Sequence, residues 1–181
     1  MKQNIDTLKP YEINSQIYDD TDLTELKDSI EANGQLEPIV VNKKNEIISG
    51  HRRYFSMVQL GWDQAEVRIA DYENDIVALI DFNKQRQKSF SDILREANIL
   101  ERESKAKLGG RGKRTDLNGK KRFLMADELA KKLGVGLSVL KKLRSIQNYE
   151  PQLLNGIDKG EITVNQAYQI IREKHLNKSN K

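Results

Sequence analysis

The segment LGGRGKRTDLNGKKR, residues 108–122, restricts the architecture of this chain more than any other stretch. It combines four glycines with dense positive charge and is too polar to pack into a core. We interpret it as a linker or loop between two halves with different sequence patterns. The predicted fold class is therefore α+β, with a small mixed α/β domain at 1–88, a connector helix and basic loop at 89–122, and an all-helical domain at 123–181.

The first half alternates apolar runs typical of strands with amphipathic helical patterns. The predicted order is a helix at 22–33, a β-hairpin at 38–50, a helix at 51–61, a strand at 66–70, a helix at 74–86 and a longer helix from residue 89. Ser89 and Asp92 are spaced to cap the long helix, and Thr163 with Gln166 forms a capping box for the last helix of the chain.

The composition excludes several classes of protein. Cysteine is absent, which excludes disulfides, thiol catalysis and zinc-thiolate sites. No uninterrupted apolar run approaches the roughly 18 residues of a membrane span. The N-terminus MKQNIDTLKP lacks the apolar core of a secretory signal. These features predict a cytoplasmic protein without a membrane partner.

Charge is segregated along the chain, although the formal net charge is only +4. Residues 1–101 hold 12 Lys and Arg against 19 Asp and Glu, residues 102–122 hold 9 against 2, and residues 123–181 hold 10 against 6. A basic half is the electrostatic footprint of a protein that binds the phosphate backbone of nucleic acid. The charge pattern therefore predicts that the second half, and not the acidic first half, contacts double-stranded DNA.

The stretch MADELAKKLGVGLSVLKKLRSI, residues 125–146, fits a helix-turn-helix motif. Ala130 is a small residue where two helices would cross, and Gly134 allows a left-handed backbone in the turn. Apolar residues that would lock the second helix stand at the expected positions: Leu129, Leu133, Val135, Leu140 and Leu143. The alternative interpretation is an ordinary helical hairpin whose lysines are solvated.

One face of the second helix would enter the major groove of DNA. The DNA-binding residues predicted on this helix are Leu137, Ser138, Lys141, Lys142 and Arg144. The lysines suit phosphate contacts, whereas Ser138 suits a contact to a base edge. Three cations of the basic loop would add backbone or minor-groove contacts, namely Arg111, Lys113 and Arg114, although a plain solvated linker explains each of them equally well.

The stretch ISGHRRYF, residues 48–55, has the character of an anion site. Gly50 would let backbone approach a ligand, and the start of the following helix offers unpaired N–H groups. Arg52 and Arg53 carry guanidinium groups that bind phosphate oxygens in bidentate fashion. Surface arginines that pair with an acidic domain are the alternative explanation.

Three segments in sequence order resemble the N-terminal domain of the ParB family: LKPYEINSQIYDDTDLTELKDSIEANGQLEPIVV, EIISGHRRYFSMVQLGW and NKQR. The helical half is similar to the central helix-turn-helix domain of the same family, so that the resemblance covers about residues 8–172. It implies a ParB/sulfiredoxin-like first domain and a site for cytidine triphosphate (CTP). The nucleotide-binding residues that it implies are Gly34 and Pro38 at the base, Ser49, Gly50, His51, Arg52 and Arg53 in a first phosphate motif, and Asn83 and Arg86 in a second.

Two positions depart from the family pattern. His51 replaces a glutamate of the first phosphate motif, and Phe82 replaces the glutamate before Asn83. The resemblance implies Mg²⁺ beside CTP, with Asn83 as its candidate ligand, but Mg²⁺ requires oxygen ligands and a phenyl ring has none. Phe82 therefore argues against efficient hydrolysis. A weak CTPase activity stays open, with no catalytic residue identified, while sulfiredoxin chemistry is excluded because the chain has no cysteine.

The resulting functional hypothesis is sequence-specific DNA binding in plasmid, chromosome or phage partition, or in a related regulatory role. The resemblance further implies a homodimer that closes like a clamp under nucleotide control, a partner ATPase and a nucleoid-associated place in the cytoplasm. The chain looks like a short form without the family's C-terminal dimerisation domain. Two alternatives stay open: a nucleotide hydrolase or small-molecule kinase of the same superfamily, and a transcription regulator with a vestigial pocket.

Overall fold

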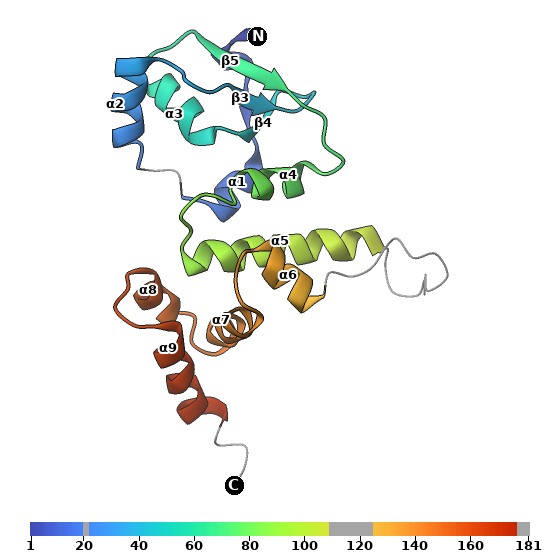
Figure 1. Ribbon diagram of the computed structural model, residues 1–181, viewed down its shortest axis with the longest axis vertical. Helices are drawn as coiled ribbons and strands as arrows, with labels where there is room; N and C mark the ends of the chain where they lie inside the picture. Colours follow the sequence, from blue (N-terminus) through green and yellow to red (C-terminus); the bar gives the residue numbers. More distant parts are fainter. Residues whose placement is uncertain (20–21, 109–124, 177–181) are drawn as a thin grey trace. The chain divides into compact units, whose positions relative to one another are not determined.

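A computed structural model of the chain describes residues 1–19, 22–108 and 125–176. By its contacts the chain divides into two units, Met1–Gln85 and Arg86–Lys181. Figure 1 shows a unit that contains strands, in blue to green, and a unit built of helices, in yellow to red. The predicted α+β fold class, with strands confined to the first part, is confirmed.

The first unit is organised around a five-stranded sheet in the order β1-β5-β3-β4-β2. Its strands are β1 (Lys2–Asn4), β2 (Lys9–Pro10), β3 (Ile39–Val41), β4 (Glu46–Ser49) and β5 (Gln64–Ile69). The central strand β3 pairs in parallel with β5 and antiparallel with β4. All three residues of β3 are buried, as expected for a short strand that is covered on both faces.

Four α-helices accompany this sheet: α1 (Glu12–Ile17), α2 (Thr24–Asn33), α3 (His51–Gln59) and α4 (Asp75–Phe82). A single turn of 3-10 helix, η1 (Ile5–Thr7), joins β1 to β2. Helix α2 packs on α3, α3 packs on β3, and α4 packs on β4. The core formed between them contains Ile5, Leu8, Ile30, Ile39, Val41, Ile47, Met57, Ala65 and Val67.

The second unit contains five α-helices in its described part: α5 (Phe90–Leu108), α6 (Ala126–Lys132), α7 (Leu137–Tyr149), α8 (Leu153–Asp158) and α9 (Val164–Ile171). A π-helical segment, η2 (Arg172–Leu176), extends α9. One core cluster of the unit comprises Ile146, Ile157, Ala167 and Ile171, and Phe90 at the start of α5 packs against it. Helix α5, predicted as part of a connector, thus contributes to the packing of this unit.

Most of the predicted elements are present, and the differences have physical causes. The sequence pattern did not predict β1, β2 or α1, because segments of two to six residues are too short to show a period. The helix predicted at 74–86 ends at Phe82. Asn83 ends it, because its backbone N–H bonds to the carbonyl of Ile80 and its side-chain amide donates to the carbonyl of Leu79.

Both predicted capping pairs are confirmed. Asp92 accepts a hydrogen bond from the backbone N–H of Ser89, and the Ser89 hydroxyl accepts one from the N–H of Asp92. Thr163 and Gln166 form the reciprocal box at the start of α9. Across the described ranges, none of the helices combines the length and the apolar character that crossing a membrane requires.

Candidate functional site

The candidate phosphate site begins where β4 passes into α3. Ser49 ends the strand, and Gly50 follows in the left-handed region with φ of 101°. His51 is the first residue of the nine-residue helix α3. The first turn of a helix carries backbone N–H groups without a partner inside the helix, together with the positive end of the helix dipole. The predicted first phosphate motif is therefore one continuous strand, turn and helix N-terminus.

His51 lies inside the first unit, with 4% of its surface exposed. Its Nε2 accepts a hydrogen bond from the backbone N–H of Tyr11, at 3.2 Å. An acceptor nitrogen carries no proton, so in the neutral ring the proton is on Nδ1. The residue that replaces the family glutamate therefore connects the start of α3 to the start of α1.

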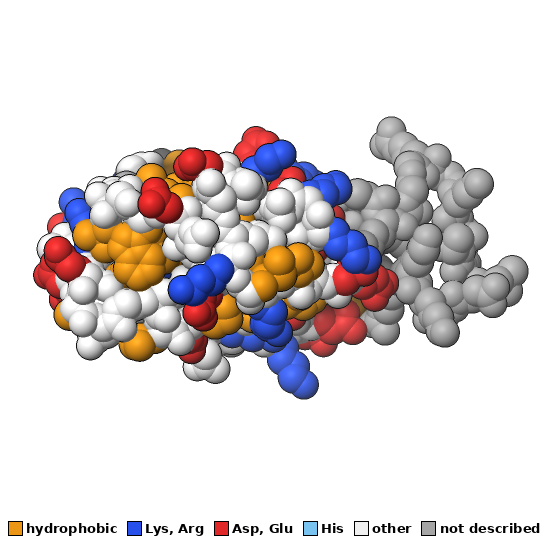
Figure 2. Space-filling model, turned by 90° about the horizontal axis from the view of Figure 1, so that it is seen from above, with side chains coloured by type: hydrophobic (Ala, Val, Ile, Leu, Met, Phe, Trp, Pro, Cys, Tyr) orange, Lys and Arg blue, Asp and Glu red, His pale blue; other side chains and the backbone are white. Residues whose placement is uncertain are grey.

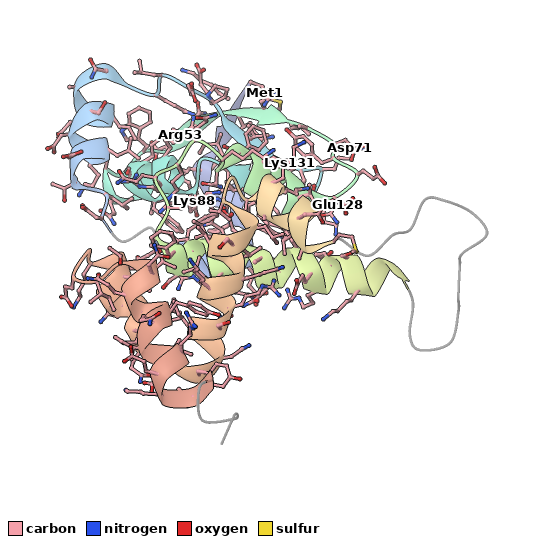
Figure 3. All side chains as sticks on the ribbon, turned by 60° about the horizontal axis from the view of Figure 1, so that its bottom comes forward. Met1, Arg53, Asp71, Lys88, Glu128 and Lys131 are labelled. Atoms are coloured by element: carbon pink, nitrogen blue, oxygen red, sulfur yellow. The ribbon has the colours of Figure 1, made fainter. Side chains whose placement is uncertain are left out.

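The two adjacent arginines point to different parts of the first unit. Arg52 is exposed, and its Nη2 donates to the backbone carbonyl of Asp22 at 2.8 Å. Arg53, labelled in Figure 3, donates through Nη1 to the carbonyls of Glu37 at 2.7 Å and Pro38 at 3.0 Å. Burial lowers the pKa of Arg53 from its ordinary value, and the nearby Glu37 carboxylate opposes that shift. The structure thus brings the first phosphate motif and the predicted base loop together through Arg53.

The predicted base loop, residues 34–38, is also attached to the sheet by Gln35. The side-chain amide of Gln35 donates to the carbonyls of Glu66 at 2.8 Å and Glu37 at 2.9 Å, and its oxygen accepts the N–H of Glu66 at 2.6 Å. Sequence reasoning missed Gln35 as part of this site. The signal that could have found it is its place between Gly34 and Pro38, where a side chain with donor and acceptor can bond both ways to an exposed strand.

The second predicted phosphate motif falls on the boundary between the units. Asn83 belongs to the first unit, and its side-chain amide donates to the carbonyl of Leu79 at 2.8 Å. Arg86 belongs to the second unit. The structure therefore places Asn83 at the end of α4, and the part of Arg86 in the nucleotide site stays a prediction.

The side chains at the end of α4 do not fit a Mg²⁺ site. Phe82 is 40% exposed and stacks edge-on with Tyr72, with ring centroids 5.9 Å apart. Asp81 forms an ion pair with Lys84 at 2.9 Å. Within the described ranges, no group of three or more His, Cys, Asp or Glu side chains could hold a metal ion. The carboxylate nearest in sequence to Asn83, that of Asp81, is thus already paired with Lys84.

A cavity of about 670 Å³ lies along one face of α3 in the first unit. Its lining comes from α1, from residues just before and after α1, and from α3. The lining residues are Pro10, Tyr11, Glu12, Asn14, Ser15, Tyr18, Asp19, Leu23, His51, Phe55, Val58 and Gln59. His51 is the one member of the predicted nucleotide set in this lining. No sequence pattern indicated this cavity, because α1 was not predicted.

The candidate nucleic-acid interface is the pair of helices α6 and α7. Helix α6 ends at Lys132, and Gly134 lies in the turn that follows, with φ of 71°. The N–H of Gly134 bonds to the carbonyl of Lys131, and the N–H of Val135 bonds to that of Ala130, which together form a Schellman motif. Gly136 then precedes α7 as its N-cap. The left-handed turn predicted at Gly134 is confirmed, and Ala130, which was predicted to lie at a helix crossing, is buried.

The predicted DNA-binding side chains of α7 have different surroundings. Ser138 and Lys141 are exposed, and Leu137 is partly buried. Lys142 donates to the side chain of Asn165 at 2.7 Å, and its Nζ lies 5.9 Å from the ring centre of Tyr168. Lys142 is therefore bound to α9.

Arg144 is also bound within the second unit. Its Nη2 forms an ion pair with Glu101 of α5 at 2.7 Å. Of the predicted cations of α7, Lys141 is thus the one with an exposed side chain, while Lys142 and Arg144 contact neighbouring helices. Contact of these three side chains with DNA stays a prediction.

Other cations bear on the same question. Arg111, Lys113 and Arg114 lie outside the described residues. Lys131 of α6, labelled in Figure 3, is exposed and close in sequence to the turn, and the sequence analysis did not select it. On the face of the molecule shown in Figure 2, Lys and Arg side chains are interspersed with Asp and Glu.

The strand, turn and helix arrangement of the first unit agrees with the family comparison. Residues 2–82 match the model of the ParB N-terminal domain. This match spans nearly the whole first unit, so the first unit is a ParB N-terminal domain.

Curated relatives are similar over a larger part of the chain. The nucleoid occlusion protein of Lysinibacillus sphaericus (strain C3-41) is 33% identical over 145 residues, which cover 71% of this chain and 48% of that protein. The chain spans about half the length of the curated relatives that it matches best.

Two solved structures share the fold. The pNOB8-like ParB N-domain has a TM-score of 0.67 at 16% identity, covering 96% of this chain and 80% of that one. The C-terminally truncated chromosome-partitioning protein ParB from Caulobacter crescentus, complexed to the centromeric parS site, has a TM-score of 0.51 at 16% identity, covering 96% and 99%. Because each similarity covers 96% of this chain, together they support the fold of both units.

Proposed function

We propose that the chain is a ParB-type protein that binds double-stranded DNA through the exposed face of α7, in partition or in a related regulatory role. The observation that carries the proposal is the Schellman turn at Gly134, which leads into a 13-residue helix whose exposed side chains include Ser138 and Lys141. The solved relative bound to parS, together with the basic balance of residues 102–181, supports it.

We further propose that the first unit binds a cytidine nucleotide at the start of α3. Gly50 and the first turn of α3 would hold phosphate oxygens, because a left-handed glycine before a helix exposes backbone N–H groups to an anion. The loop 34–38 would read the base. A bound CTP would supply a triphosphate group whose negative charge suits this helix N-terminus.

The nucleotide site supports binding better than hydrolysis. Phe82 and the paired Asp81 leave the end of α4 without the carboxylate ligands that Mg²⁺ prefers. We therefore favour nucleotide binding as a regulatory signal over a hydrolase or a kinase. A homodimer, a partner ATPase and association with the nucleoid stay predictions that follow from the family.

A matched pair of variants tests the DNA interface. Lys141→Ala should weaken binding to all DNA sequences and reduce the slope of log affinity against log salt by about 1, because one phosphate contact is lost. Lys142→Ala should instead lower the free energy of unfolding of the second unit by about 1 kcal/mol, because its hydrogen bond and cation–π contact to α9 are lost. Fluorescence anisotropy with labelled DNA and urea unfolding measure the two effects.

Lys159→Ala is the control for this pair, because Lys159 is an exposed lysine of the same unit at the end of α8. It should change neither the salt slope nor the stability by more than about 0.5 kcal/mol. An unchanged salt slope for Lys141→Ala, or a loss shared equally by Lys159→Ala, would contradict the interface on α7.

A further inference from the structure

The guanidinium group of Arg53 is built into the folded first unit. Its Nη1 has two N–H groups, and the carbonyls of Glu37 and Pro38 accept from it at 2.7 and 3.0 Å. The Glu37 carboxylate lies 3.6 Å from the same atom. The side chain of Arg53 is 20% exposed, whereas that of Glu37 is 80% exposed. Both donors of Nη1 are therefore used by the base loop before any ligand arrives.

Burial gives these hydrogen bonds a structural role. Only 20% of the Arg53 side chain is exposed, so most water has been removed from around the cation, and this desolvation lowers its pKa. Arginine stays protonated in proteins, so the buried charge has to be compensated by acceptors. The carbonyls of Glu37 and Pro38 provide that compensation. If the side chain turned away toward a phosphate, the loop would lose the donor that holds it.

Gly50 shows that the position of Arg53 matters to the phosphate motif. A Cβ at residue 50 would lie 3.2 Å from Nη2 and 3.3 Å from Cζ of Arg53. The guanidinium group therefore lies against the backbone at Gly50 while it bonds the loop. Through this one side chain, the backbone that starts α3 and the loop before β3 are held in register.

The far side of the loop is held independently by Gln35. Its side chain forms two hydrogen bonds to the backbone of Glu66 on β5, at 2.8 and 2.6 Å, one as donor and one as acceptor. The loop 34–38 is thus fastened at one end to β5 and at the other to α3. Because hydrogen bonds of Gln35 and Arg53 hold both ends of this five-residue segment, its surface is preformed in the ligand-free protein.

Arg52 differs from Arg53 in each of these respects. It is exposed, and its described contact is a single hydrogen bond to the carbonyl of Asp22. Exchanging that contact for a phosphate would leave the loop 34–38 intact. A charge-assisted bond to phosphate is also stronger than one to a neutral carbonyl, so the exchange is favourable.

We propose that Arg53 is a positioning residue that holds the base-reading loop 34–38, and that Arg52 with the first turn of α3 binds the phosphates. This inference rests on the proposed nucleotide site and assigns a different role to each of its two arginines. Arg53 controls which base is accepted, because it sets the loop. Arg52 controls how strongly any triphosphate is bound, because its charge acts on the phosphates alone.

The first arm of the test needs no nucleotide. In the ligand-free full chain, Arg53→Met should speed hydrogen exchange of the loop amides by about tenfold or more, since hydrogen bonds from a charged donor are lost. Arg52→Met and Arg68→Met should change this exchange by less than about twofold. Arg68 is an exposed arginine of β5 and controls for loss of charge.

The second arm measures binding of CTP, ATP and inorganic tripolyphosphate by calorimetry. Arg53→Met should reduce the preference for CTP over ATP by about tenfold while leaving tripolyphosphate affinity within about twofold. Arg52→Met should weaken all three ligands by a similar factor, about tenfold. Equal losses of CTP and tripolyphosphate in Arg53→Met, with unchanged loop exchange, would overturn the proposal and make Arg53 a phosphate ligand.

A second variant protects the test against a folding failure. Gln35→Ala releases the loop from β5 without touching either arginine, so it should reproduce the faster exchange and the reduced base preference. If it preserves both, the loop does not need to be held and the proposal is wrong. If the wild-type chain binds none of the three ligands, the proposed nucleotide site fails, while the exchange arm still decides whether Arg53 holds the loop.

Discussion

At the scale of single residues, Gly50 carries two separate demands. Its φ of 101° lies in a region that a side chain makes costly, and a Cβ there would press on the guanidinium of Arg53. Gly61, which ends α3, has φ of 72° and nothing within 4 Å of its Cβ position. The two glycines therefore share the backbone demand, whereas the contact demand applies to Gly50 alone.

This difference gives a quantitative prediction for stability. Gly61→Ala should lower the free energy of unfolding of the first unit by about 1–2 kcal/mol, the cost of a left-handed backbone. Gly50→Ala should cost at least about 1 kcal/mol more, because Arg53 must shift away from Glu37 and Pro38. Urea unfolding followed by the fluorescence of Trp62, the single tryptophan, reports on this unit. Equal costs for the two variants would show that Arg53 tolerates a side chain at residue 50.

At the scale of elements, the start of α5 is capped from a distance. Asp158, the last residue of α8, accepts hydrogen bonds from the backbone N–H of Phe90 at 2.8 Å and of Ser91 at 3.3 Å, and from the Ser91 hydroxyl. A carboxylate at a helix N-terminus satisfies orphan donors and interacts favourably with the helix dipole. The side chain of Asp158 thus joins α8 to Ser91 of α5, 67 residues away in sequence.

Removing this cap should destabilise the second unit. Asp158→Ala should lower its free energy of unfolding by about 1–2 kcal/mol, as for other lost N-caps. Asp158→Asn should cost about half as much, because it keeps one acceptor oxygen and loses the charge. Far-UV circular dichroism during urea unfolding measures both. Glu161→Ala, an exposed acidic neighbour, should stay within about 0.5 kcal/mol, and a comparable loss there would mean that net charge rather than capping is responsible.

The comparison of elements also shows what sequence patterns can and cannot predict. Helices α2, α3 and α5 and the β3–β4 hairpin were predictable, because their apolar residues follow a helical or strand pattern and glycine, turn or capping residues mark an end of each. Helix α1 was not, because six residues cannot display a helical period. For the site, Gly50 and Gly134 were predictable because backbone geometry requires glycine there. The binding of Arg53 to the base loop and of Lys142 to α9 was not, since a sequence does not say which partner a long cation selects.

For the whole molecule, the division of the chain into an acidic and a basic part corresponds approximately to its division into two units. Residues 1–101 are acidic overall and residues 102–181 are basic, while each unit has an apolar core cluster of its own. A protein that binds polyanionic DNA with its basic part can keep an acidic part away from the phosphates by electrostatic repulsion alone. We therefore expect DNA to contact the second unit and a nucleotide to contact the first.

Hydrogen exchange of the full chain, with and without duplex DNA, decides whether α7 presents the DNA-binding surface. Slower exchange on DNA binding should concentrate in the turn at Gly134 and the first half of α7, around Ser138 and Lys141, because bound phosphates and bases exclude water there. The loop 34–38 should be unaffected by DNA. Protection confined to the first unit, or DNA binding that leaves residues 134–141 as accessible as before, would contradict the account.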